Sequence, residues 1–223
     1  QEFTAFSLPA QALTMAACQE ALAGKPAGQE AVCVRLKTSA GTVYFDAAAA
    51  VSGAVDTAPD TAAALADLTA REGLYAIASL SCLQDFKAAN ADVEGRGLKN
   101  TGGYIFYDGN NSLWLDPAKP STREYVCALA REIAELGFDE LLLTDFSYPT
   151  VGKIDKINYN TDVPLADNLD LLLSDLNAAL EPYGMLLSVE IPEAVITGGP
   201  DAVAGLDLNR LAGRVDRIYA ATP

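Results

Sequence analysis

Short apolar segments alternate with helical stretches along almost the whole chain, and this alternation limits the possible folds more than any other feature. Most of these segments are nearly continuously apolar, as expected for strands that are buried on both faces of a sheet. Strands that alternate with helices pair in parallel through right-handed crossovers. The sequence therefore predicts strands at residues 3–8, 31–37, 74–82, 140–146, 185–191 and 217–221.

Four helical stretches lie between these strands, and one of them has both ends marked in the sequence. Ser121 and Glu124 have the spacing of a capping box, and Gly137 suits the left-handed conformation that ends a helix. This helix leads directly into strand 140–146, so that the two form one αβ unit. We expect helices at residues 10–23, 61–72, 121–136 and 165–183.

The order of the elements predicts an α/β fold of the (β/α)8 type, the TIM barrel. The aromatic content is only 8%, while Ala, Leu and Val are abundant, which favours helices packed on buried strands over a β-sandwich. A closed barrel needs eight strands and about 250 residues, whereas we count six strands in 223 residues. We therefore expect residues 1–223 to form a single, C-terminally truncated barrel domain, with its last two units missing or supplied elsewhere.

The charge of the chain and its lack of histidine exclude several classes of function. Acidic residues outnumber basic ones by 30 to 15, and the net charge of -15 repels nucleic-acid phosphates and anionic lipid headgroups. Without histidine, neither Ser-His-Asp nor Cys-His catalysis is available, and a His-containing zinc site is excluded. We expect no nucleic-acid partner, no cofactor and no metal. Carboxylates, lysines, tyrosines and thiols are left for acid, base or nucleophile chemistry.

The cysteines and the apolar segments carry no sign of a redox site or a membrane span. The cysteines lie far apart without a CxxC pair, and three of them fall inside apolar strand or helix patterns, so we expect buried free thiols. No segment is long and apolar enough for a transmembrane segment, and we find no signal peptide. The sequence begins at Gln1, which is typical of a trimmed chain, and it does not predict an oligomeric state.

Two elaborations follow predicted strands and mark the functional face. Ser39-Ala40-Gly41 predicts a turn into a short hairpin arm at 42–45. The long connection 84–115 contains a second predicted hairpin, in which segments 104–107 and 112–115 flank an Asp-Gly turn. Both follow the carboxyl ends of strands, where parallel barrels place their sites, and long ordered loops there indicate function.

Carboxylates stand at the ends of two consecutive strands. Asp145 follows the apolar run of strand 140–146, and Glu190 follows that of strand 185–191. A charged group at such a place is costly unless it lies in a solvated cleft or is paired. If both acids face one cavity, they suit a glycosidase, with one as nucleophile and the other as acid/base. The alternatives are that Asp145 caps the following turn and that Glu193 takes the catalytic role of Glu190.

Three further side chains are candidates for the same mouth. Lys37 ends strand 31–37 and Asp85 lies just past strand 74–82, so that both can complete a polar ring. Lys37 also has the chemistry for a Schiff base, but an ion pair with Asp145 or Asp85 is the simpler interpretation. Trp114, in the second hairpin, can stack on a sugar ring or hold the hairpin together.

Four segments resemble a glycoside hydrolase family once catalogued as a domain of unknown function, DUF4015: residues 112–117, 121–137 and 138–140, and Thr144-Asp145-Phe146-Ser147-Tyr148-Pro149. This core covers about one sixth of the chain, and a weaker likeness extends over most of it. The resemblance implies an α-amylase-like (β/α)8 barrel, a carbohydrate substrate, Asp145 as nucleophile and Glu190 as acid/base. It also implies that Tyr148 and Tyr219 bind the substrate, in addition to Lys37, Asp85 and Trp114.

The sequence departs from the family pattern at three places near this site. Ser147 stands where a basic residue is typical, Thr38-Ser39 replaces an acidic pair, and Glu190 replaces an Asp. The leading hypothesis is a glycosidase that acts on an oligo- or polysaccharide outside the cell or at the cell surface. Its rivals are a degenerate barrel that binds glycans or serves as a surface scaffold without turnover, and a lyase or aldolase centred on Lys37.

Overall fold

A computed structural model describes residues 4–221 and shows a six-stranded sheet in which every neighbouring pair is parallel. The strand order follows the chain, as in a (β/α) barrel. The six predicted strands are confirmed, although the first is shorter than predicted and Phe3 lies outside the described residues. The strands are β1 (Phe6–Ser7), β2 (Ala31–Lys37), β3 (Tyr75–Ser81), β5 (Glu140–Thr144), β7 (Leu186–Pro192) and β8 (Arg217–Ala221).

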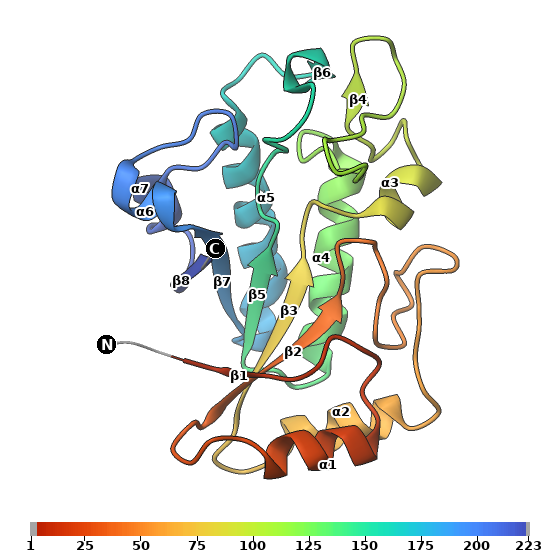
Figure 1. Cartoon of the computed structure of the whole chain (residues 1–223), viewed down its shortest axis with the longest axis vertical. Coiled ribbons are helices and arrows are strands. Elements are labelled where there is room, and N and C mark those ends of the chain that lie inside the picture. The colour runs from red at the N-terminus through yellow and green to blue at the C-terminus, as the bar shows by residue number, and fades with distance from the viewer. Residues whose placement is uncertain (1–3, 222–223) are drawn as a thin grey trace.

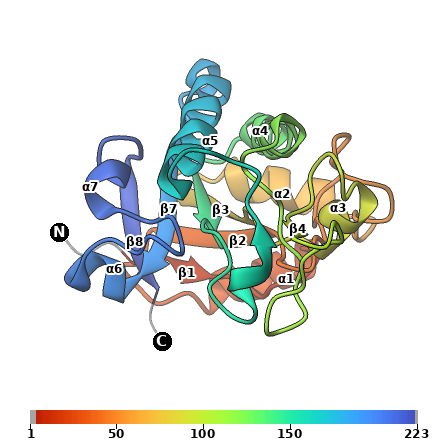
Figure 2. The ribbon, with the colours of Figure 1, turned by 90° about the horizontal axis from the view of Figure 1, so that it is seen from above.

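The two longest helices, α4 and α5, cover one side of this sheet (Figure 1 and Figure 2). In Figure 1, α4 and α5 run along the strands, while α1 and α2 lie near the amino-terminal strand ends. A small antiparallel pair, β4 (Lys99–Asn100) and β6 (Ile157–Asn158), joins two loops beyond the carboxyl ends. The helices are α1 (Met15–Ala23), α2 (Thr61–Thr69), α3 (Phe86–Ala91), α4 (Pro120–Glu135), α5 (Leu165–Leu180), α6 (Glu193–Gly198) and α7 (Leu208–Leu211), with 3-10 turns η1 (Ile154–Lys156) and η2 (Glu181–Tyr183).

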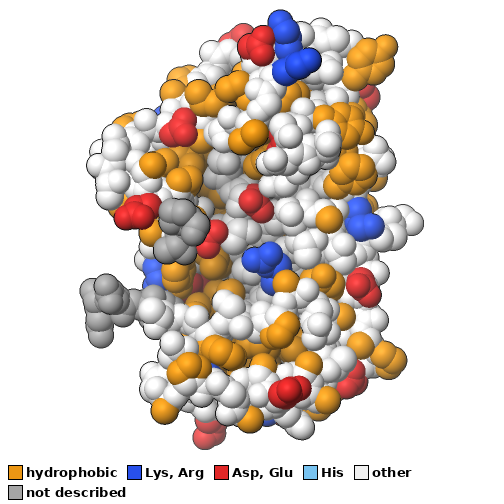
Figure 3. Space-filling model, viewed as in Figure 1, with side chains coloured by type: hydrophobic (Ala, Val, Ile, Leu, Met, Phe, Trp, Pro, Cys, Tyr) orange, Lys and Arg blue, Asp and Glu red, His pale blue; other side chains and the backbone are white. Residues whose placement is uncertain are grey.

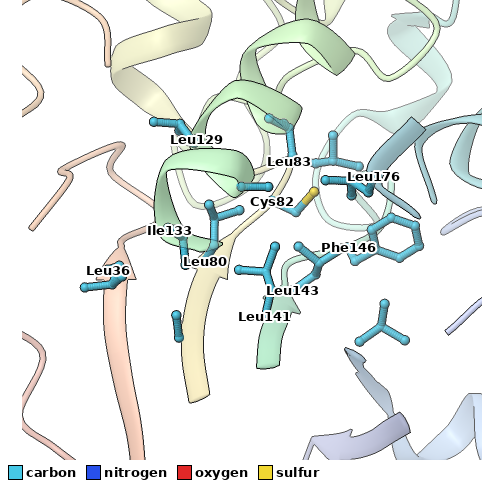
Figure 4. Packing of buried hydrophobic residues seen from close by; sticks show 14 of the residues in the cluster. Leu36, Leu80, Cys82, Leu83, Leu129, Ile133, Leu141, Leu143, Phe146 and Leu176 are labelled. Atoms are coloured by element: carbon cyan, nitrogen blue, oxygen red, sulfur yellow. The ribbon is translucent and has the colours of Figure 1, made fainter. Parts of the chain in front are cut away.

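The outer face of the sheet forms the hydrophobic core with the helices. Figure 4 shows Leu80 and Leu143 from β3 and β5 packed against Ile133 of α4 and Leu176 of α5. Each of these four side chains is at most 1% exposed. Burying one leucine contributes roughly 1.5–3 kcal/mol, so this layer is a major source of stability.

The inner face of the same strands is polar, which differs from the apolar strands predicted. Alternate residues of a strand point to opposite faces, and the inward positions include Arg35, Ser79, Glu140, Ser188 and Glu190. The sheet curls into a half-barrel with this face on the inside, as Figure 2 shows from above. The incomplete (β/α) barrel is therefore confirmed, but its interior is not the usual stack of branched apolar side chains.

The prediction for α4 is right at its C-terminal end and wrong at its N-terminal end. Gly137 has a φ of 92°, so the predicted left-handed terminator is confirmed. The capping box is wrong, because the helix begins at Pro120 and its N-cap is Lys119, which makes no side-chain cap hydrogen bond. Proline has a pre-set φ and no N–H to satisfy, so it starts the helix one residue earlier than Ser121.

The two predicted loop hairpins have different outcomes. The first turn is present, because Gly41 N–H donates to Thr38 O at 3.0 Å. Gly41 has a φ of 89°, and a Cβ on it would lie 2.1 Å from Asp85 Oδ1, so only glycine fits. The second prediction is wrong in its pairing. Segments 104–107 and 112–115 do not pair with each other, because Leu98 lies between them and hydrogen-bonds to Phe106 and Trp114.

The cysteines are free thiols, as predicted: Cys18, Cys82 and Cys127 are buried, and Cys33 is half-buried. Burial raises the pKa of Cys82 to about 12, which keeps its thiol protonated and unreactive at neutral pH. Among residues 4–221, no helix is long and apolar enough to cross a membrane.

The packing of the outer face gives a stability prediction. Leu143→Ala removes a side chain that is fully buried between β5 and the helices, and we expect a loss of about 2–5 kcal/mol in the free energy of unfolding. Urea titration followed by circular dichroism measures it. Val163→Ala, at a residue 46% exposed, is the control and changes stability by less than about 0.5 kcal/mol. Equal effects of the two substitutions would contradict this assignment of the core.

Candidate functional site on the inner face of the half-barrel

A pocket of about 200 Å³ opens on the inner face of the sheet. Figure 3 shows this face hollowed near its centre, with acidic and basic side chains at the hollow. Residues in or next to five of the parallel strands, β1, β2, β3, β5 and β7, line the pocket. The lining residues are Ser7, Leu8, Ala10, Cys33, Arg35, Ser79, Leu142, Thr144 and Glu190.

Asp145 directly follows β5 and has an unusual backbone conformation. Its φ of 49° lies in the left-handed region, which Asp tolerates better than most residues but at some cost. The surrounding hydrogen bonds hold this conformation, because Cys82 N–H donates to Thr144 O and Leu83 N–H donates to Asp145 O. The side chain reaches the neighbouring strand, where Ser81 Oγ donates to Asp145 Oδ2 at 2.6 Å.

Glu190 lies in β7, next to the strand that carries Asp145. The register pairs Leu143 with Val189, so Glu190 is level with Thr144, one residue before Asp145. The strands are therefore adjacent, as the sequence predicts. The pKa of Glu190 is raised above its ordinary value, first by burial and then by the negative charge of Asp145. The two carboxyl groups are thus close enough to interact electrostatically.

Arg35 is a residue of this pocket that the sequence analysis missed. It is exposed on the inner face of β2 and lines the pocket together with Glu190. Within residues 4–221, its guanidinium has no hydrogen-bond or ion-pair partner, although its charge lowers the pKa of Glu190. The sequence does indicate that Arg35 faces away from the core, because residues of strand 31–37 alternate between two faces. Val32, Val34 and Leu36 form the apolar face, and Cys33, Arg35 and Lys37 alternate with them.

Glu140 anchors a buried polar cluster on the same face, toward the amino-terminal ends of the strands. Its carboxylate is fully buried and accepts hydrogen bonds from Tyr75 Oη (2.9 Å), Ser188 Oγ (2.9 Å) and Tyr219 Oη (2.7 Å). Arg217 Nη1 adds an ion pair at 2.6 Å. A buried charge is tolerated when it is paired and hydrogen-bonded, and this cluster meets both conditions. It forms a rigid polar floor for the half-barrel.

Lys37 and Asp85 form a buried ion pair at the mouth of the barrel. Lys37 Nζ lies 2.8 Å from Asp85 Oδ2, and the two side chains are 1% and 0% exposed. Lys37 also donates to Ser81 O at 2.5 Å, and the register of β2 slips between Arg35 and Lys37. Such a bulge redirects a side chain. Asp85 also caps α3 by accepting from Ala88 N–H at 2.8 Å. The sequence analysis named Asp145 and Asp85 as possible ion-pair partners of Lys37, and the partner is Asp85.

The predicted aromatic contacts are placed differently. Trp114 is 7% exposed, and its Nε1 donates to Asp108 Oδ2 at 2.9 Å, so it leaves little ring surface for a sugar. Tyr148 is 1% exposed and accepts from Asn168 Nδ2 at 3.0 Å. Tyr219 is paired with Glu190 in the sheet, but its hydroxyl belongs to the Glu140 cluster. None of the three lines the pocket, and their roles as sugar contacts stay predictions.

The alternative carboxylate, Glu193, begins α6 beyond the end of β7 and does not line the pocket. No group of three or more Cys, Asp or Glu side chains within residues 4–221 is arranged to hold a metal ion. The cavity therefore has one carboxyl group, that of Glu190, with one guanidinium and several hydroxyl groups. The Asp145 carboxylate does not line the cavity, but its charge reaches Glu190. This set suits proton transfer and the recognition of a polyhydroxylated molecule.

The fold and this inner face define an incomplete (β/α) barrel of the kind found in glycoside hydrolases. A family model described as "Putative glycosyl hydrolase domain", DUF4015, matches residues 18–221, and the chain belongs to this family. The resemblance drawn from the sequence is thereby confirmed. No curated protein matches the chain.

Solved structures share the fold at low sequence identity. A hypothetical protein from Ruminiclostridium thermocellum is 22% identical with a TM-score of 0.66, and the match covers 83% of this chain and 96% of that one. An α-galactosidase from Thermus thermophilus is 12% identical (TM-score 0.59, 99% of this chain and 43% of that one). The glycoside hydrolase domain of PgaB from Bordetella bronchiseptica is 16% identical (TM-score 0.56, 85% and 63%). This chain thus spans less than two thirds of the length of either hydrolase.

The charge of Arg35 gives a prediction for the titration of the site. Arg35→Gln removes a positive charge that lowers the pKa of Glu190, so this pKa rises further. Carboxyl ¹³C chemical shifts recorded against pH measure the change. Arg71→Gln is the matched control, because Arg71 pairs with Asp67 on the surface and does not line the pocket. A fall in the pKa of Glu190, or no change, would contradict the geometry described.

The buried ion pair gives a second prediction. Lys37→Met leaves the buried Asp85 carboxylate without its charge partner, and we expect a loss of about 3–5 kcal/mol in the free energy of unfolding. The double variant Lys37→Met/Asp85→Asn removes the unpaired charge and is more stable than the single variant. Denaturant titration measures both. A single variant as stable as the exposed-pair control, Arg71→Met, would show that the pair is not buried in solution.

Proposed function

We propose that this protein hydrolyses glycosidic bonds with Asp145 and Glu190 as its catalytic carboxyl groups. The observation that carries the proposal is the placement of the two acids on adjacent parallel strands, with burial and the charge of Asp145 raising the pKa of Glu190. Pairs of carboxyl groups with different environments are the working parts of most glycosidases. Membership of a family described as a glycosyl hydrolase domain supports the same reaction.

The environments of the two acids suggest how the roles divide. Asp145 accepts a hydrogen bond from Ser81, which fixes the direction of its carboxylate, as a nucleophile requires. Glu190 has the raised pKa of a general acid. In the first step, Glu190 donates its proton to the glycosidic oxygen while Asp145 attacks the anomeric carbon and the bond to the leaving sugar breaks. In the second, Glu190 takes a proton from a water molecule whose oxygen attacks the anomeric carbon, and the bond between this carbon and Asp145 breaks, which releases the sugar.

Ser81 and Arg35 take the places of the basic residue that is typical after the fourth strand of the family. Ser147 stands at that position in this chain. Hydrogen bonding from Ser81 orients Asp145, and the guanidinium of Arg35 supplies positive charge from the other side of the pocket. The hydrogen bond from Ser81 and the charge of Arg35 support activity although the basic residue is missing. The missing basic residue itself favours the second candidate, a barrel that binds glycans or serves as a scaffold without turnover. The buried ion pair of Lys37 gives no support to Schiff-base chemistry.

We further propose that the substrate is an oligo- or polysaccharide outside the cell or at its surface, and that the described residues act as one domain. The polar inner face supports a polyhydroxylated ligand, because sugar hydroxyls need donors and acceptors on the wall that binds them. In a closed barrel, two more strands would stand between β8 and β1 and would cover this face.

Substitution of the two acids tests the proposal. Asp145→Asn and Glu190→Gln each lower kcat/KM by roughly 100-fold or more, measured as the release of reducing ends from a panel of oligo- and polysaccharides. Glu193→Gln is the matched control, a neighbouring acid outside the pocket, and keeps activity. Turnover that survives both substitutions would sink the assignment. Glycan binding without turnover in any version supports the second candidate.

The pKa of Glu190 gives the pH dependence. As general acid it must be protonated, so the rate falls as the pH rises through its pKa. Because this pKa is raised, the fall occurs at a higher pH than the ordinary value for Glu. A kcat/KM profile measures the position of this limb, and Arg35→Gln moves it to still higher pH. A limb that stays in place in Arg35→Gln, with the enzyme active, would rule out Glu190 as the acid.

A further inference from the structure

A second pocket of about 200 Å³ is lined by neither Asp145 nor Glu190. Its lining includes Lys99 of β4 and Asn158 of β6, and in Figure 1 these two strands stand above the arrowheads of β3 and β5. Its side chains are all polar: Glu94, Lys99, Asp116, Lys119, Asn158 and Asn160. The volume is several times the ~30 Å³ share of one water molecule, so the pocket has room for a small ligand.

Asp116 carries the unsatisfied group of this pocket. The residue is 1% exposed, and its Oδ1 accepts from Ala118 N–H at 3.0 Å. Within residues 4–221, its other oxygen, Oδ2, is buried and has no hydrogen-bond partner. Burial raises the pKa of this carboxyl to about 6. A buried acceptor oxygen that no donor reaches costs free energy. A buried acceptor without a partner on the wall of a pocket points to a ligand that donates hydrogen bonds.

The other walls supply donors as well as acceptors. Lys119 Nζ donates to Gly97 O at 2.7 Å and has another N–H available, and Lys99 Nζ pairs with Glu94 Oε1 at 2.5 Å. Asn158 Oδ1 accepts from Asn160 N–H, which leaves the Asn158 amide N–H groups and the Asn160 side chain to face a ligand. The two ammonium groups are balanced by two carboxylates, so the pocket favours neither an anion nor a cation.

We propose that this second pocket binds one neutral sugar unit, separately from the cleavage site. A hydroxyl of the sugar donates to Asp116 Oδ2, and neighbouring hydroxyls accept from Lys119 and from the asparagine amides. The proposal goes beyond bond cleavage and does not require it.

Titration of the ¹⁵N-labelled protein with monosaccharides tests the proposal. The neutral probes are D-glucose, D-galactose and N-acetyl-D-glucosamine, and the charged ones are D-glucuronate and D-glucosamine. We expect saturable shifts of the backbone amide signals of Gly103, Asn158 and Asn160 with at least one neutral sugar, and weaker binding of the charged sugars. No saturable shift with any neutral sugar, or tighter binding of a charged sugar, would overturn the proposal.

Asp116→Asn tests whether the Asp116 carboxylate binds the sugar. It keeps the oxygen that accepts from Ala118 and replaces the unpaired acceptor by a donor, so we expect binding at least about tenfold weaker. Asp201→Asn is the matched control, because the Asp201 carboxylate also accepts backbone N–H groups in a turn but lies outside this pocket. Equal affinity of the two variants would refute the assignment of Asp116.

A second variant keeps the test decisive if Asp116→Asn fails to fold. Asn160 has a φ of 48°, which glycine adopts freely, so Asn160→Gly retains the backbone and loses the side-chain amide. We expect binding about fivefold weaker in this variant, and unchanged binding counts against the proposal. The double variant Asp145→Asn/Glu190→Gln retains the shifts, which distinguishes failure of this site from failure of the proposed hydrolase.

Discussion

The buried carboxylate of Glu140 is the contact on which the inner side of the sheet depends. It stands on β5 and collects hydrogen bonds from β3, β7 and β8, so that one charge ties four neighbouring strands together. A closed barrel fills this space with layers of branched apolar side chains. Here the polar cluster takes that place, and its guanidinium partner lies near two tyrosine rings, 5.8 Å and 5.9 Å from their centres. This part of the interior can therefore remain polar with the charge of Glu140 paired.

The candidate catalytic groups lie on the same inner face, beyond this floor, and their difference in environment follows from the strand geometry. Glu190 points inward from within a strand, where burial favours its protonated form. Asp145 lies past the end of the neighbouring strand, and its left-handed backbone brings the carboxylate to Ser81. The same end of the sheet thus places two like groups in different environments, which is the arrangement that paired acids in enzymes have.

The sheet could be predicted well because each strand is marked by a local apolar pattern in the sequence. Parts of the site depend instead on residues that are distant in the sequence. Strands β2 and β8 have the predicted bounds, since apolar runs between turn residues leave little choice. Arg35 was missed because its strand was taken as buried on both faces. The place of Trp114 depends on its hydrogen bond to Asp108 and on the pairing of Leu98 across the loop, and neither contact has a local signal. Pro120 moved the start of α4 because its ring favours N1 more strongly than the capping spacing favours Ser121.

The left-handed backbone at position 145 also limits how this protein can change during evolution. Only glycine and asparagine, besides aspartate, enter that region at low cost, so most single substitutions there strain the loop as well as remove the acid. Descendants that keep the barrel are therefore expected to retain Asp or to change to Asn or Gly at this position. The backbone conformation alone would thus restrict the residues that evolution can place at this one codon.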